Sequence, residues 1–276
     1  MCKAAKNSGS QIPDRLCFGI RSGSFYGSVY NETLSFDLQV REGWNFLAFL
    51  VGKDSLNLYT RLRIVAYNRG QVSVGYRTYS YTYYDDPGLD MYFGAKYQND
   101  GIQLQKGFSG YIMEIRLYSN SALTMAQLDT HIDWDCTVSA KKLCDFCPAL
   151  ATSIPQMCLE DLTGSGRASG YLKASYNFDT ASVQGYGREF YRSISAGKAY
   201  DFWLGTAFPQ PRSLKNDPHR TEAHGLFFDG DDFITGNTIK DTDTSLSQIL
   251  TLENQFSVDF WVRFMQTELK EPIYMF

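Results

Sequence analysis

The chain has 276 residues, of which 43% are hydrophobic, enough to bury the core of one large domain or two ordinary ones. Aromatic residues make up 15% of the chain, a composition that favours β-sheet. The net charge of −4 and the lack of a basic cluster argue against nucleic-acid binding. The longest apolar run, residues 46–51, is far too short to span a membrane.

Strands are predicted in succession after a polar start. Residues 1–15 are expected to form a loop or a disordered segment, and they lack the apolar stretch of a signal peptide. Residues 44–51 carry apolar side chains at both alternating sets of positions, which is typical of a strand covered on both faces. Turns are predicted at residues 52–55, 68–70 and 85–88. Strands are predicted at about 17–30, 34–40, 44–51, 56–62 and 89–94, and residues 64–83 supply one or two more around the turn at 68–70.

Residues 108–132 combine a strand with a short helix. Alternation predicts that the face with Met113, Ile115 and Leu117 is buried and that the opposite face is not. Thr124 and Gln127 have the spacing of a capping box, and Leu123 and Leu128 that of a hydrophobic staple.

This stretch resembles the closing strand, turn and helix of laminin-G-like, concanavalin A-like jelly-roll domains. The matching residues are Phe108, Gly110, Ile112, Glu114, Ile115, Arg116, Leu117, Tyr118, Ala122, Leu123 and Thr124. Residues 44–52 are similar to the central strand of the same family. The resemblance implies an all-β fold, a concanavalin A-like antiparallel β-sandwich (jelly roll) with one short helix. Residues 16–132 would then be the C-terminal part of such a domain.

Residues 171–276 resemble the opening part of a second laminin-G-like domain. Residues 225–235 are similar to the family's acidic hairpin, and residues 250–264 to its Phe-Thr-Val-Ser-Phe-Trp-Val strand. A cysteine-rich linker at 133–170 would separate the two parts. The favoured interpretation is a fragment of a tandem array, and the alternative is one permuted domain in which 171–276 complete the sheets begun by 16–132.

The linker holds four of the six cysteines, Cys136, Cys144, Cys147 and Cys158. We expect disulfides there, because a small loop-rich segment cannot build a core of its own. A zinc site and free buried thiols remain alternatives, although only one C-x2-C pair is present. Cys2 and Cys17 would pair with each other or with partners outside this chain. A glycosylation sequon at Asn31 agrees with an extracellular or cell-surface location.

Sequence motifs for catalysis are lacking: there is no paired-carboxylate strand, phosphate loop or nucleophile elbow. We therefore expect no enzyme but a recognition or adhesion module that binds glycans or extracellular proteins, in a larger surface protein. The alternatives are a glycan-processing enzyme of the same fold whose catalytic strand lies elsewhere, and a structural spacer.

Three alternating tyrosines, Tyr79, Tyr81 and Tyr83, are the candidate ligand contacts, since they would form one row on a strand. The alternative is that they pack in the core. Acidic clusters at 85–86, 229–232 and 241–243 raise the possibility of calcium, but none forms a complete ligand loop, and no cofactor is assigned.

Overall fold

The computed structural model describes the chain in separate segments. The segments are residues 2–4, 16–21, 23–29, 32–39, 41, 43–53, 60–68, 71–79, 90–94, 96–97, 104–105, 108–119, 122–129, 172–176, 183–185, 188–192, 201–204, 219–221, 225–229, 234–236 and 255–265. They are almost entirely antiparallel strands, which confirms the prediction of an all-β fold.

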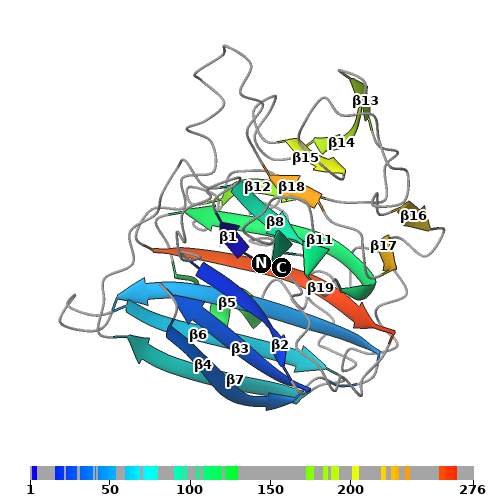
Figure 1. Ribbon diagram of the computed structural model, residues 1–276. Helices are drawn as coiled ribbons and strands as arrows, with labels where there is room; N and C mark the ends of the chain where they lie inside the picture. Colours follow the sequence, from blue (N-terminus) through cyan, green and yellow to red (C-terminus); the bar gives the residue numbers. More distant parts are fainter. Residues whose placement is uncertain are drawn as a thin grey trace, which may run out of the picture.

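Two large sheets contain nearly all of these strands (Figure 1). The first sheet has the order β13 (Val183–Gly185), β14 (Arg188–Arg192), β15 (Asp201–Leu204), β18 (Ile234–Gly236), β8 (Asp90–Phe93), β1 (Cys2–Ala4), β2 (Leu16–Arg21), β3 (Ser24–Val29) and β4 (Glu32–Gln39). The second has the order β16 (His219–Thr221), β17 (Gly225–Asp229), β11 (Ser109–Ser119), β19 (Phe256–Phe264), β5 (Trp44–Lys53), β6 (Thr60–Asn68) and β7 (Gln71–Tyr79), and β12 (Leu172–Tyr176) also pairs with β11. A small ribbon joins β9 (Lys96–Tyr97) to β10 (Leu104–Gln105).

Aromatic side chains fill the space between the two sheets. Phe18 of β2 stacks on Phe49 of β5 with ring centroids 4.3 Å apart, and Phe49 also contacts Phe260 of β19 at 5.7 Å. The backbones approach closely as well, because a Cβ added at Gly75 would lie 2.8 Å from the Phe36 ring. The two layers therefore share one core, as in a β-sandwich.

Strand β5 confirms the prediction that residues 44–51 are covered on both faces. Its residues from Trp44 to Gly52 are all buried. Phe49 points to the first sheet, whereas Phe46 packs on the other side against Trp261 of β19 at 5.5 Å. The run is apolar at every position because both faces of the second sheet bury side chains here.

Strand β11 differs from the prediction of a single buried face. Arg116 and Tyr118, placed by alternation on the unburied face, are 2% and 3% exposed. The strand has neighbours on both edges, and its register with β19 shifts between Met113 and Arg116. The shift also breaks the predicted alternation: Ile112 lies opposite Val262 and Arg116 opposite Asp259, and these two residues of β19 are on different faces. The pattern therefore missed both the bulge and the cover on the second face.

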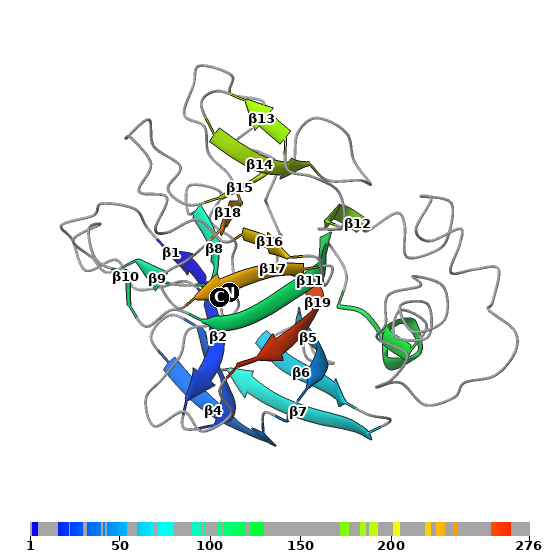
Figure 2. The ribbon, with the colours of Figure 1, turned by 90° about the vertical axis from the view of Figure 1, so that its right-hand side faces the viewer.

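The predicted capping box is confirmed in the turn that follows β11. The backbone N–H of Thr124 donates to Gln127 Oε1 at 2.8 Å, and the N–H of Gln127 donates to Thr124 Oγ1 at 3.3 Å. The helix covers residues 125–129, and both staple residues, Leu123 and Leu128, are buried. Figure 2 shows this helix beside β11 and β5, on the side away from β2 and β4. No helix within the described segments is long and apolar enough to cross a membrane.

Strands from both ends of the chain lie within the same sheets. β19 pairs with β11 on one side and β5 on the other, and β18 lies between β15 and β8. Strands from both halves of the chain therefore belong to the same pair of sheets. The predicted linker, residues 133–170, lies outside the described segments.

Two strand assignments are corrected by the pairings. Residues 17–30 are a hairpin of β2 and β3 rather than one strand, and Gly23 takes a φ of +76° between them. Residues 225–235 are not a hairpin, because β17 belongs to the second sheet and β18 to the first. The chain passes from the second sheet to the first between these two strands, and Phe228 and Ile234 are buried in different sheets.

Candidate functional site: a basic pocket beside an exposed apolar row

The second sheet has an outer face, turned away from the first sheet. Phe49 points to the first sheet, so Leu50, the next residue, points outward. The strand register then places other residues beside Leu50 on this face: Arg63 of β6 on one side and Ser257 of β19 on the other. Tyr76 of the edge strand β7 follows Arg63. A row of four side chains thus crosses the outer face.

The turn after β11 covers one end of this row. The backbone N–H of Leu123 donates to Ser257 Oγ at 2.8 Å, which fixes the turn over β19. At the neighbouring position a Cβ added to Gly52 would lie 3.1 Å from Cβ of Ala122. The turn therefore lies over β19 and the end of β5 and leaves Arg63 and Tyr76 beyond its edge.

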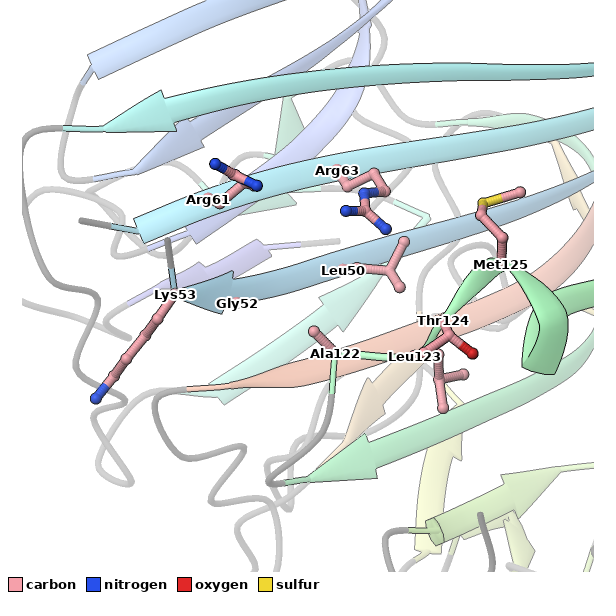
Figure 3. Close-up of a pocket in the computed structure, with 9 residues that line it drawn as sticks. All are labelled: Leu50, Gly52, Lys53, Arg61, Arg63, Ala122, Leu123, Thr124 and Met125. Carbon is pink, nitrogen blue, oxygen red and sulfur yellow. The ribbon is translucent and has the colours of Figure 1, made fainter. Parts of the chain in front are cut away.

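A pocket of about 280 Å³ lies between the turn and strands β5 and β6 (Figure 3). Its apolar lining comes from Leu50, Ala122, Leu123 and Met125, and its basic lining from Lys53, Arg61 and Arg63. In Figure 3 the guanidinium of Arg63 lies on the side of Leu50, whereas Lys53 extends away from the other lining residues. The pocket therefore has an apolar floor and roof and a basic side.

Among the described residues, no acidic side chain lines the basic side of the pocket. Arg61 and Arg63 are two residues apart on one strand and so share the outer face, with Cα atoms about 7 Å apart. The Arg61 Nε is buried and has no hydrogen-bond partner among the described residues. A buried donor without a partner is unfavourable, and two adjacent cations repel each other. An anion bound here would relieve both effects.

An exposed apolar row adjoins the pocket on β7. Val72, Val74 and Tyr76 are 46%, 44% and 64% exposed, and they alternate along the outer face of this edge strand. The cross-strand partner of Tyr76 is Arg63, so the row and the basic side of the pocket are continuous.

A buried ion pair lies deeper on the same face. Arg116 Nη1 of β11 and Asp259 Oδ1 of β19 are 3.0 Å apart, and the two side chains are 2% and 0% exposed. The strand patterns did not single out these two charges, because β11 also contains Glu114 and β19 also contains Arg263. Nothing local to either strand shows that the two side chains meet.

The structure does not support Tyr79 as a ligand contact. Its side chain is fully buried, and its hydroxyl donates to the carbonyl oxygen of Gly27 at 3.1 Å. It lies on the inner face of β7, where it packs in the core as the alternative interpretation expected. Tyr81 and Tyr83 lie outside the described residues.

The remaining candidates lie mostly outside the described residues: Asn31, Cys136, Cys144, Cys147 and Cys158. Cys17 is 2% exposed and disulfide-bonded, and its cross-strand partner position on β1 is Cys2. Within the described segments, no three His, Cys, Asp or Glu residues are grouped to hold a metal ion.

The pocket and the exposed row were not found from the sequence, because their residues come from four separate stretches: 50–53, 61–63, 72–76 and 122–125. The one available signal was the outward alternation of Arg61 and Arg63 within β6. Comparisons with family models, with curated proteins and with solved structures found no match for this chain.

Proposed function

We propose that the chain is a non-catalytic recognition module of the concanavalin A-like, laminin-G-like jelly-roll class, acting at the cell surface or outside the cell. Its partner is a protein with an apolar surface flanked by acidic residues. The observation that carries this proposal is the row of Val72, Val74 and Tyr76, exposed beside two arginines of the same sheet face.

The composition of this face favours a protein partner over a glycan. Aliphatic side chains next to tyrosine and arginine are typical of the central part of protein interfaces, where tyrosine and arginine contribute most. Arg61 and Arg63 would face acidic residues of the partner, which steers association and makes its rate fall with salt.

The extracellular location rests on cysteine chemistry. Disulfides form and persist in oxidising compartments and are rare in the cytosol of most organisms. The disulfide at Cys17 supports the proposed location, together with the four cysteines of the predicted linker.

A binding screen with two matched variants tests the proposed surface. The purified chain is applied to a panel of extracellular protein domains and to a glycan array. Val74→Asp introduces a negative charge into the exposed row. Ser35→Asp places the same charge on an exposed position of β4, the edge of the other sheet.

We expect a protein partner whose affinity falls at least about tenfold with Val74→Asp and stays unchanged with Ser35→Asp. The association rate should fall as salt is raised. Binding to glycans alone, or equal loss with both variants, would refute the proposed surface.

A further inference from the structure

We propose that the pocket between the turn at residues 122–125 and strands β5 and β6 binds a small amphipathic organic anion, with its acidic group at Arg63 and its apolar part against Leu50 and Met125. This ligand site goes beyond the protein-binding role proposed above and does not depend on it.

The charge of the pocket calls for an anion. Lys53, Arg61 and Arg63 line it together, and no acidic residue in the described part of the chain does. Arg63 is the central cation, since its guanidinium lies on the side of Leu50 in Figure 3. Arg61 adds a second charge on the same strand face, and its buried Nε has no hydrogen-bond partner among the described residues. Arginine binds carboxylate and similar oxyanions through paired N–H donors.

The remaining lining requires that the anion also carry an apolar part. Leu50 and Leu123 are buried, and Met125 is half-buried against the same core. Methionine adapts its shape to irregular apolar ligands because its side chain is flexible. An inorganic anion would leave this surface uncovered, and a purely apolar ligand would leave the cations uncompensated.

The size of the pocket limits the ligand to a small molecule. Its volume of about 280 Å³ is close to the lower end of ligand pockets. A cavity of about 150 Å³ holds one benzene ring, so this pocket fits a molecule of roughly ten to twelve non-hydrogen atoms. An eight-carbon carboxylate has this size and both required chemical groups.

Calorimetric titration with octanoate tests the proposal, with octan-1-ol and inorganic sulfate as probes of each half of the ligand. Wild type should bind octanoate saturably. It should bind octan-1-ol and sulfate each at least about tenfold more weakly than octanoate. Arg63→Gln should weaken octanoate binding about tenfold or more, since a charge-assisted hydrogen bond is lost. Arg63→Lys keeps the charge and should lose less.

Two further variants separate the ligand site from effects on folding. Met125→Glu keeps a helix-forming residue but puts a negative charge at the roof, and it should abolish octanoate binding. Arg263→Gln removes an exposed cation on the same sheet face, at a register position six residues along β5 from Leu50, about 20 Å away. This control should bind octanoate like wild type, and melting curves should show every variant folded.

Four results would overturn the proposal: no octanoate binding by wild type, equal binding by Arg63→Gln, octan-1-ol binding as tight as octanoate, or sulfate binding as tight as octanoate. Failure of the protein-binding role would give a different result: a partner protein would bind the Val74→Asp variant as tightly as wild type.

Discussion

Replacing Asp259 by asparagine removes the anion of the buried ion pair and almost preserves the size of the side chain. Arg116 then keeps a positive charge that is only 2% exposed, at the position where its partner Oδ1 lay 3.0 Å away. Two unit charges at this separation attract by about 5 kcal/mol at an effective dielectric constant of 20. In the intact pair this attraction compensates for much of the free energy lost when both charges leave water. In the variant the desolvation cost of Arg116 remains, but the attraction is gone.

Removal of one partner of a buried pair costs about 3–5 kcal/mol. At this chain length each kcal/mol shifts the melting temperature by roughly 2 °C, so Asp259→Asn should melt about 6–10 °C below wild type. Arg116→Met together with Asp259→Leu replaces the pair by apolar side chains of similar size. This double variant should be about as stable as wild type, because the desolvation cost disappears together with the attraction.

A mutant cycle compares wild type, Arg116→Met, Asp259→Leu and the double variant by differential scanning calorimetry and chemical denaturation, and Asp259→Asn is measured beside them. Asp129→Asn serves as the control, since it removes a carboxylate from an exposed position on the helix at 125–129. We expect this control within about 0.5 kcal/mol of wild type. A loss below about 1 kcal/mol in Asp259→Asn, or a coupling energy near zero, would refute a buried charge pair at this position.

Three further predictions concern local geometry. Gly110→Ala should prevent stable folding or cost several kcal/mol of stability, because Gly110 has a φ of +150° and the added Cβ would lie 2.1 Å from a backbone carbonyl oxygen of β19. Thermal melting measures this loss, and a wild-type melting temperature would contradict the prediction. Thr124→Ala should destabilise the chain by about 0.5–2 kcal/mol, because the capping box is lost. Denaturant titration measures this loss, and an unchanged unfolding midpoint would contradict the role of the cap. Non-reducing peptide mapping should find Cys17 linked to Cys2, its register partner, and a link to any other cysteine would contradict this pairing. Selective reduction of the disulfide should lower the stability by about 3 kcal/mol, the value for a loop of this length.

The local pattern of the sequence determined several elements correctly. Residues 46–51 are apolar at consecutive positions, and that alone indicated a strand covered on both faces. Thr124 and Gln127 have the spacing of a capping box, and the hydrogen bonds form as expected. Strands β6 and β7, on either side of the turn predicted at 68–70, pair antiparallel with Asn68 opposite Gln71. Each of these features depends on neighbouring residues only, so the sequence contains the information for it.

In a regular strand such as β5 the sequence also determined which residues share a face, because the side-chain period of two is a property of the extended backbone. In β11 the register shift breaks this period, and the sequence did not reveal it. It did not determine whether that face meets a second layer, a turn or solvent. Arg116 and Tyr79 show this limit. Alternation placed Arg116 on an unburied face and Tyr79 in a ligand row, and both side chains are buried.

Only the tertiary structure decided the contacts between distant segments. The insertion of β19 between β5 and β11 brings Asp259 to Arg116, 143 residues earlier in the chain, and brings Ser257 under the turn that forms the roof of the pocket. Such contacts follow from sheet order and register, which depend on the joint burial of apolar faces from the whole chain. No single stretch contains that information, and for this reason the candidate binding surface could be found only after the sheets had been assembled.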